Sequence, residues 1–302
     1  MINKKILIIS GGNTSERKIS LISAKAVKKA LEEVGYKVII YDLLNGREHT
    51  KKLSQEVDVI FPLIHGKEGE DGTLYDLLRK LKKPFIGSNC QGTKVGFHKI
   101  LFKKFLEQEN IPTSEWIEVT CKEDIKMFGF ACVLKAASGG SSKEVAILKT
   151  RRDLNRKIAD KILSLDDQFL IERYLEGIEV TVGILNHQPL PVMEIRPPDG
   201  QWFNYNNKYS GKALEIPHAP SLTKNQQELV QQIAMTIHST LKLEPYSRTD
   251  FIISDGKPFC LEVNPPCGVG LTPESLFPKT AQAVGISFQE LVKILVNSTL
   301  KR

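Results

Sequence analysis

Residues 248–264 read RTDFIISDGKPFCLEVN, two apolar, strand-like runs joined by a Ser-Asp-Gly-Lys turn. If the runs pair as a β-hairpin, the two-residue side-chain period of a strand places Glu262 and Asn264 on one face. Asp250 then lies opposite Glu262, with Arg248 beside it. The hairpin therefore gathers three oxygen-bearing side chains and one guanidinium at one place.

Oxygen-only ligation of this kind favours Mg²⁺ or Mn²⁺ over zinc. A protein that holds Mg²⁺ with few carboxylates usually leaves the remaining positions to nucleotide phosphates. A hairpin with a solvated polar face has the same pattern, so the hairpin alone does not decide between a metal site and a plain surface. The rest of the chain has to decide.

The length of 302 residues predicts two or three compact units rather than one small core. A composition with 41% hydrophobic and 25% charged residues is ordinary for a globular enzyme. The apolar run Ile6–Ile9 has only the length of a strand and is followed by Gly11-Gly12, which argues against a signal peptide or membrane helix. We expect a cytoplasmic protein that does not bind membranes.

Cysteine and charge patterns exclude further classes. Neither a disulfide framework nor a zinc site is indicated by the five scattered cysteines, Cys90, Cys121, Cys132, Cys260 and Cys267. The net charge of +7 is spread along the chain, and no nucleic-acid-binding motif accompanies it. We therefore expect no nucleic-acid partner, and a small anion such as a nucleotide suits the charge equally well.

The first ninety or so residues alternate between strands and helices. The predicted elements are strands at Lys5–Ser10, Lys37–Tyr41 and Val57–Leu63 and helices at Ser20–Gly35 and Thr73–Lys82. Such alternation predicts an open parallel α/β sheet, which binds ligands at the carboxyl ends of its strands. Gly11-Gly12 and His65-Gly66 lie at such ends.

The pattern changes after about Lys94 to a small α+β unit, followed by a third unit that begins near Glu179. The predicted elements are a basic helix from Lys94 to Asn110, strands near Cys132–Lys135, Val145–Leu148 and Gln168–Glu172, and helices at Arg151–Leu163, Lys224–Leu241 and Ser287–Leu300. We expect unit boundaries at 1–94, 95–178 and 179–302.

Two segments of the middle unit suit a nucleotide. The loop Ser138–Ser142 is rich in Gly and Ser, so its N–H groups can approach phosphate oxygens, and Lys135 precedes it. The stretch Glu172–Leu175 could offer backbone hydrogen bonds to an adenine edge, with Glu179 at the ribose. Alone, the loop could equally be a turn and the stretch an inter-unit connector.

Two segments of the first unit suit an amino acid. Gly11–Glu16 opens a helix, where anions normally bind, yet Glu16 is better suited to an ammonium group or to simple helix-start electrostatics. The polar stretch His65–Gly72 is either a functional rim or a surface loop. Two irregular stretches, Asn207–Gly211 and Gly268–Ser275, are typical of lids or binding loops.

Taken in order, these motifs resemble the D-alanine–D-alanine ligases of the ATP-grasp superfamily. The matching positions are Gly11-Gly12-x-Thr14-x-Glu16, His65-Gly66-x-x-Gly69-Glu70-Asp71-Gly72, Lys99, Lys135, Gly140-Ser141-Ser142, Lys208-Tyr209, Arg248-x-Asp250 and Glu262-x-Asn264. The resemblance extends from about residue 5 to about residue 297 and implies a three-domain ATP-grasp fold, α/β and α+β in class, with an N-terminal open parallel α/β domain.

The resemblance also implies roles for individual residues. ATP phosphates would contact Lys99, Lys135, Gly140 and Ser142, and adenosine would contact Glu172, Arg173, Tyr174, Leu175 and Glu179. Two Mg²⁺ or Mn²⁺ ions would be held by Asp250, Glu262 and Asn264. The first amino acid would contact His65 and, through its ammonium, Glu16 within a set that includes Ser141 and Tyr209. The oxyanion would be stabilised by Arg248 and the N–H of Gly268, and the second carboxylate by Lys208 and Ser275.

The implied activity joins two D-alanines through an acyl phosphate, at the expense of ATP, for peptidoglycan synthesis, and the implied assembly is a homodimer. The segment Pro265-Pro266-Cys267 departs from the family pattern Thr-x-Pro, and Ser275 comes two residues later than in the family. Because this region lines the second amino-acid site in the family, a related ligase with another amino acid or a hydroxy acid as acceptor is the alternative. A non-catalytic nucleotide-binding protein that kept the fold is a further alternative, against which intact Lys135, Asp250, Glu262 and Asn264 speak.

Overall fold

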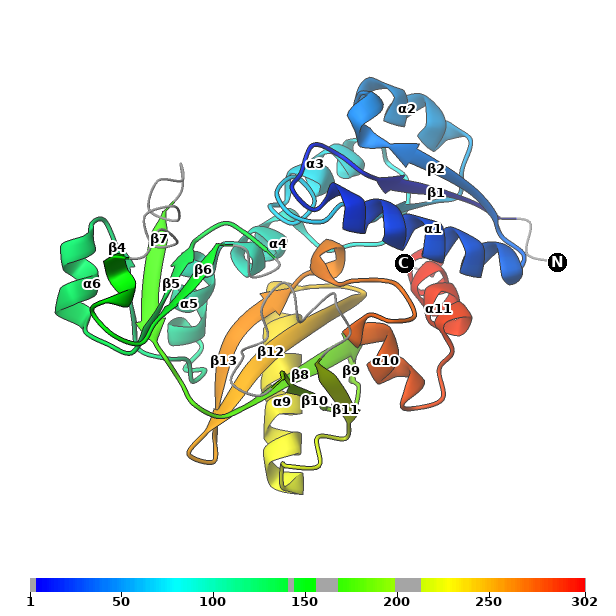
Figure 1. Ribbon diagram of the computed structural model, residues 1–302. Helices are drawn as coiled ribbons and strands as arrows, with labels where there is room; N and C mark the ends of the chain where they lie inside the picture. Colours follow the sequence, from blue (N-terminus) through cyan, green and yellow to red (C-terminus); the bar gives the residue numbers. More distant parts are fainter. Residues whose placement is uncertain (1–3, 141–143, 156–167, 199–212, 302) are drawn as a thin grey trace.

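A computed structural model of the chain describes residues 4–140, 144–155, 168–198 and 213–301. Within these ranges the strands form three sheets (Figure 1). None of the described helices has the length and apolar character needed to cross a bilayer.

The N-terminal sheet is parallel, as predicted, and its strands lie in the order β2-β1-β3. Its elements are β1 (Lys5–Ser10), α1 (Arg17–Glu33), β2 (Lys37–Asp42), α2 (Glu48–Gln55), β3 (Val59–Pro62) and α3 (Thr73–Lys80), with a short 3₁₀ turn at Leu43–Asn45. Alternate residues of β1 face opposite sides, so Ile6 and Ile8 pack toward α1 while Leu7 and Ile9 pack with α3 residues. Each such fully buried side chain contributes about 1.5–3 kcal/mol to folding.

The second sheet is antiparallel and small, with the order β4-β7-β5-β6. The elements from here are α4 (Cys90–Phe97), α5 (Lys99–Gln108), β4 (Trp116–Val119), α6 (Lys122–Phe128), β5 (Cys132–Ala136), β6 (Val145–Leu148), a 3₁₀ turn at Asp153–Asn155 and β7 (Phe169–Arg173). This sheet has a core of its own, built around Leu134, Leu148 and Ile171. Only the first residues of the predicted helix Arg151–Leu163 are described, and those from Asp153 to Asn155 form the 3₁₀ turn.

The third sheet has the order β11-β10-β8-β12-β13, with β9 paired to β8. Its elements are β8 (Ile178–Leu185), β9 (Gln188–Pro189), β10 (Met193–Arg196), β11 (Leu214–Pro217), α9 (Lys224–Leu241), β12 (Tyr246–Ser254) and β13 (Lys257–Asn264), followed by a 3₁₀ turn at Pro266–Gly268, α10 (Leu276–Gln282) and α11 (Phe288–Leu300). The helix α9 covers one face of this sheet (Figure 1), and its Thr223 and Gln226 form a capping box.

The first and third sheets share one hydrophobic core. Ile8 and Leu31 of the first unit belong to the same buried cluster as Tyr246, Phe277 and Leu295. The last helix, α11, therefore lies beside α1 at the start of the chain (Figure 1). The small sheet stands apart from both (Figure 1).

The predicted helix from Lys94 to Asn110 was wrong as a single element. The structure has two helices, because His98 adopts an extended conformation between them with ψ of 104°. The His98 Nδ1 accepts from the Leu101 N–H at 3.4 Å and so caps the second helix. The break turns Lys99 toward the neighbouring Gly139 carbonyl oxygen, to which its ammonium donates at 2.7 Å.

Candidate active site

Two cavities meet between the three sheets. The larger, of about 690 Å³, lies between the first and third sheets, and the smaller, of about 540 Å³, lies between the second and third. Their linings share Lys99, Gly139, Gly140 and Glu262. A ligand in one cavity can therefore reach a ligand in the other across this common wall.

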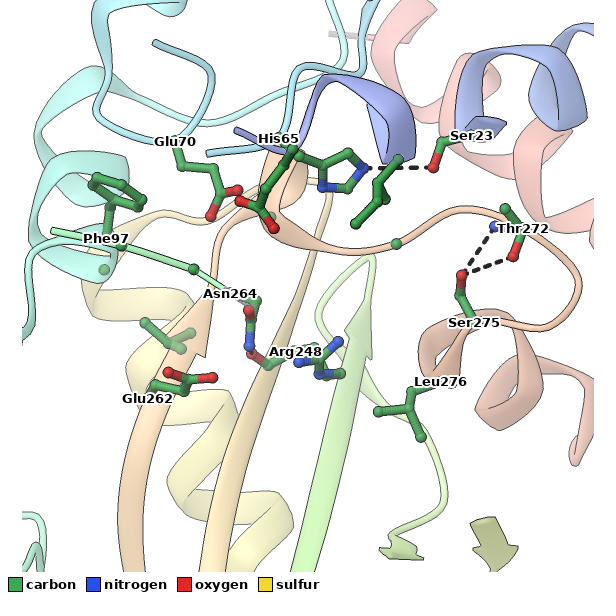
Figure 2. A pocket seen from close by; sticks show the side chains of 18 of the residues that line it. Ser23, His65, Glu70, Phe97, Arg248, Glu262, Asn264, Thr272, Ser275 and Leu276 are labelled. Carbon is green, nitrogen blue, oxygen red and sulfur yellow. Dashed lines mark hydrogen bonds between the residues drawn. The ribbon is translucent and has the colours of Figure 1, made fainter. Parts of the chain in front are cut away.

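The N-terminal wall of the larger cavity carries Glu16, His65 and Glu70. Figure 2 shows His65 and Glu70 facing Glu262 and Asn264 across the cavity, with the His65 ring directed at Ser23. The Ser23 Oγ lies 3.4 Å from His65 Nε2. Burial lowers the pKa of His65, and this favours a neutral imidazole in the pocket.

Glu70 is the second buried carboxylate of this wall, with 7% of its surface exposed. Its Oε1 accepts from the Gly66 N–H at 2.6 Å. Burial, together with the charge of Glu16, raises the pKa of Glu70 from 4.5 to about 8. Glu70 therefore holds its proton at neutral pH.

Glu16 sits close to the backbone of two glycines. A Cβ added at Gly140 would lie 2.8 Å from Glu16 Oε2, and one added at Gly66 would lie 3.0 Å from it. The absence of side chains at Gly66 and Gly140 is what leaves room for the carboxylate. The glycine-rich loop is thus brought to the residue predicted to bind an ammonium group.

The opposite wall is the predicted hairpin, and its register is confirmed. Asp250 pairs with Glu262 and Arg248 with Asn264, followed by a bulge after Asp250. The bulge changes the pairing beyond this point, so Phe251 lies opposite Cys260. The predicted cluster of oxygen-bearing side chains is therefore present on adjacent strands.

Arg248 and Asp250 pair with each other in this structure. The Arg248 Nε and Nη2 donate to the two carboxylate oxygens of Asp250 at 2.9 and 2.8 Å. Thr181 Oγ1 and Asn264 Nδ2 also donate to this carboxylate, at 2.5 and 3.1 Å. All four acceptor positions of Asp250 are therefore used, and it can ligate a metal only if one of these donors moves.

The loop after the hairpin differs from the prediction in one respect. The Gly268 N–H donates to the Pro265 carbonyl oxygen at 2.8 Å within the 3₁₀ turn, so the predicted oxyanion donor is already bonded. The turn also buries Cys267 completely, where its Sγ accepts from Tyr75 Oη at 3.3 Å. Cys267 faces the protein core, whereas Gly268 and Ser275 line the larger cavity.

The smaller cavity is built on β5, β7 and β8. The Glu172 carboxylate on β7 lies between two lysines. Lys135 pairs with its Oε1, and the Lys103 ammonium lies 2.6 Å from its Oε2. Burial by itself raises the pKa of Glu172, but the two ammonium groups more than offset this and hold the pKa well below its usual range. Glu172 is therefore a buried but ionised carboxylate.

The connector after β7 offers backbone groups to this cavity. The Arg173 N–H donates to Glu115 O at 2.8 Å, and the Tyr174 N–H donates to Ala131 O at 3.1 Å. The N–H of Leu175 has no such partner among the described residues. Leu175 is thus the position of the predicted adenine-binding stretch whose N–H is open to a ligand.

Every described residue of the predicted site lines one of the two cavities. The larger is lined by Glu16, His65, Lys99, Gly140, Arg248, Glu262, Asn264, Gly268 and Ser275. The smaller is lined by Lys99, Lys135, Gly140, Glu172, Arg173, Tyr174, Leu175, Glu179, Asp250 and Glu262. Ser141, Ser142, Lys208 and Tyr209 lie outside the described residues.

Other cavity residues had not been assigned a role from the sequence. Glu70 belongs to the polar stretch His65–Gly72, but the residues beside it in the sequence do not indicate that its carboxylate is buried. Glu194, 1% exposed, lines the smaller cavity and accepts from Arg196 Nε at 2.6 Å. Lys279 lines the larger cavity and donates to Glu215 at 2.8 Å. The Glu-x-Arg spacing on one strand face could have pointed to the Glu194 and Arg196 pair.

Comparisons with known proteins identify the family. The family model described as the D-ala D-ala ligase C-terminus matches residues 93–297, and the one for its N-terminus matches residues 44–88. The D-alanine–D-alanine ligase of Maridesulfovibrio salexigens is 36% identical over 96% of this chain and 97% of its own length, and that of Clostridium botulinum is 35% identical over 98% and 99%.

Solved structures give the same result. The crystal structure of the D-alanine–D-alanine ligase from Bacillus anthracis complexed with ATP superimposes with a TM-score of 0.85 and 28% identity, covering 99% of this chain and 98% of that one. The three sheets described above are thus the ATP-grasp fold. The chain belongs to the D-alanine–D-alanine ligase family.

Proposed function

We propose that this chain joins two D-alanine molecules into D-alanyl-D-alanine while ATP is converted to ADP and phosphate. The observation that carries the proposal is the common wall of Lys99, Gly139, Gly140 and Glu262 between the two cavities. A nucleotide in the smaller cavity would present its terminal phosphate there to an amino acid in the larger one. No protein nucleophile is needed for such a transfer.

In the first step, a carboxylate oxygen of one D-alanine attacks the γ-phosphorus of ATP. The bond to the bridging oxygen breaks, and ADP leaves with that electron pair. Glu16 would hold the ammonium of this D-alanine, because it is a buried carboxylate on the cavity wall. Lys99 and Lys135 would hold the phosphates, since both ammonium groups lie beside the cavity that would hold the nucleotide.

In the second step, the amine nitrogen of the other D-alanine attacks the acyl carbon of the acyl phosphate. The ammonium of this second D-alanine first gives one proton to solvent. The bond between the acyl carbon and the phosphate oxygen then breaks, phosphate leaves with that electron pair, and the nitrogen gives a second proton to the departing phosphate as the amide forms. Arg248 is the cation on the cavity wall suited to the oxyanion, once its pair with Asp250 has opened. Ser275 lines the same cavity and suits the second carboxylate.

The donor set also suits a divalent cation. Glu262 is the best-placed ligand, because it stands at the junction of the cavities and its carboxylate accepts no hydrogen bond from the described residues. Asn264 keeps its amide oxygen while its nitrogen donates to Asp250. A bound Mg²⁺ or Mn²⁺ would neutralise charge on the phosphates. Asp250 would join as a ligand when Arg248 turns to the substrate.

The remaining parts of the proposal rest on the family. We place the unit boundaries at residues 94/95 and 178/179, the reaction in the cytoplasm within peptidoglycan synthesis, and the working form as a homodimer.

The decisive experiment measures phosphate release and dipeptide formation with ATP, Mg²⁺ and a panel of D- and L-amino acids, alone and in pairs. We expect turnover with D-alanine as the sole amino acid, above the rate without any amino acid. Turnover only with D-alanine plus a different acceptor would reject the proposal in favour of the alternative acceptor. Nucleotide binding without turnover for any pair would favour a binding protein.

A further inference from the structure

Lys103 is a buried cation that lines neither cavity. Its side chain is 2% exposed, and it lies one helical turn after Lys99 on α5. Its ammonium contacts Thr113 Oγ1 at 2.6 Å, Ser114 Oγ at 3.0 Å and Glu172 Oε2 at 2.6 Å. Because these contacts use all three N–H groups, Lys103 cannot donate to a ligand.

Glu172 stands between Lys103 and the cavity. Its Oε2 accepts from Lys103 and from Ser114 Oγ, the latter at 3.0 Å, so this oxygen is saturated. Its Oε1 pairs with Lys135, which lines the same cavity. A carboxylate has about four acceptor positions. Among the described residues, two donors use the positions on Oε2 and Lys135 uses one on Oε1, so the acceptor position left for a ligand is on Oε1.

The charges of this group also matter. Lys103 and Lys135 carry two positive charges against the one negative charge of Glu172, and all three are largely buried. With Lys103 behind it, Glu172 is neutralised from the protein side, and the charge of Lys135 is left for an anion. Without Lys103, Glu172 and Lys135 would neutralise each other, and this three-residue group would lose its net positive charge.

We propose that Lys103 is a positioning residue that makes the nucleotide site select adenine: it fixes the Glu172 carboxylate so that Oε1 accepts a hydrogen bond from an exocyclic amino group. This rests on the proposed use of ATP. A purine with a carbonyl oxygen at that place, as in inosine or guanosine, presents an acceptor to an acceptor. Such a base is rejected because Glu172 is held ionised and cannot rotate to offer a donor.

The test compares binding of ATP and ITP to the whole protein, measured by calorimetry without amino acids, and then kcat and KM for both nucleotides with D-alanine. We expect the wild type to prefer ATP on the order of 10- to 100-fold, the usual range for a hydrogen bond to a charged group. Lys103→Met should reduce that preference by about tenfold and raise the KM for ATP, while kcat at saturating ATP is retained.

Lys104→Met is the matched control, because Lys104 is the next residue of α5 but is 52% exposed and pairs with Glu118 at the surface. It should keep the wild-type preference. A folded Lys103→Met protein with an ATP preference within about twofold of the wild type would overturn the inference. Because binding is measured without amino acids, a wild type that binds ATP but makes no dipeptide would count against the proposed function alone.

A second comparison holds if Lys103→Met does not fold. Glu172→Gln and the double variant Lys103→Met/Glu172→Gln remove the carboxylate charge, and the double variant leaves no uncompensated charge at position 103. Since Lys103 acts through Glu172, the two proteins should show the same ATP-to-ITP ratio. A further loss of preference in the double variant would overturn the inference.

Discussion

Glu70 and Glu172 are two glutamates of similar burial, one at each cavity, yet they differ in charge. Glu70 is 7% exposed and Glu172 is 2% exposed. Burial, together with the like charge of Glu16, raises the pKa of Glu70 to about 8. Glu172 lies between two ammonium groups, and its pKa is lowered. Burial raises the pKa of both carboxylates, so the difference shows that a buried glutamate stays ionised only where nearby cations offset the effect of burial.

The largest expected effect is at Glu262, the carboxylate that both cavities share. Glu262→Gln keeps the shape but removes the charge that would bind a divalent ion. We expect phosphate release to fall on the order of a thousandfold or more. Thermal unfolding should stay near that of the wild type, because the described residues make no hydrogen bond to this carboxylate. Substantial activity in the variant would remove Glu262 from the metal site.

The next effect concerns stability and tests the charged side of the comparison. Glu172→Ala leaves Lys103 and Lys135 buried without their counter-charge, which should lower the free energy of unfolding by about 3–5 kcal/mol. Urea unfolding measures it. Glu118→Ala is the control, because its pair with Lys104 is exposed and should contribute at most about 1 kcal/mol. Equal losses in both variants would mean that burial adds nothing to the pair.

The neutral side of the comparison is tested by pH. The pKa of Glu70 lies at about 8 in the folded protein and at 4.5 as an ordinary value, so folding retains a proton that the unfolded chain releases. The contribution of Glu70 to the free energy of unfolding is complete below pH 4.5 and is lost as the pH rises to about 8. Over this range the free energy of unfolding should fall by up to about 1.4 kcal/mol per pH unit.

Glu70→Gln keeps the acceptor for the Gly66 N–H but does not titrate. The difference in urea-unfolding free energy between the wild type and this variant should therefore change between about pH 5 and pH 8, to the disadvantage of the wild type at the higher pH. Parallel curves for the two proteins would show that Glu70 is ionised throughout this range.

The smallest effect is expected at Cys267, which lies within the 3₁₀ turn Pro266–Gly268 beside Glu70. Cys267→Ala removes one hydrogen bond from Tyr75 and a small buried volume, which should cost about 1 kcal/mol of stability. The KM for the acceptor amino acid should not change, because the thiol faces the core. A changed acceptor preference would show that this departure from the family reaches the second substrate after all.

The hairpin could be predicted because its information is local. A two-residue period and one turn fix which side chains of Arg248–Asn264 face each other. The parallel N-terminal sheet followed in the same way from its alternating elements. The two walls of the site could be named, but not how they are joined.

What could not be predicted depends on contacts between distant segments. Lys103 lies next to the exposed Lys104 on α5, and the local sequence does not show which of the two is buried. Lys103 is buried because it pairs with Glu172, which is far away along the chain. Two local features could not be predicted either, because no periodicity in the sequence indicates them. They are the hydrogen bond from the Leu101 N–H to His98 at the helix break and the hydrogen bond from the Gly268 N–H to the Pro265 carbonyl oxygen. The pair of Arg248 with Asp250 is closer to the sequence, since residues two apart on a strand share a face.

The shared core of the first and third sheets also sets the order in which parts of the chain can fold during synthesis. Ile6 and Ile8 of β1 pack in one core with Leu295 and Val296 of α11. The first strand to be synthesised is therefore among the last to be fully buried. During synthesis, the small sheet, which has a hydrophobic core of its own, can fold earlier, whereas the core of the N-terminal sheet can be completed only after residue 296 has left the ribosome.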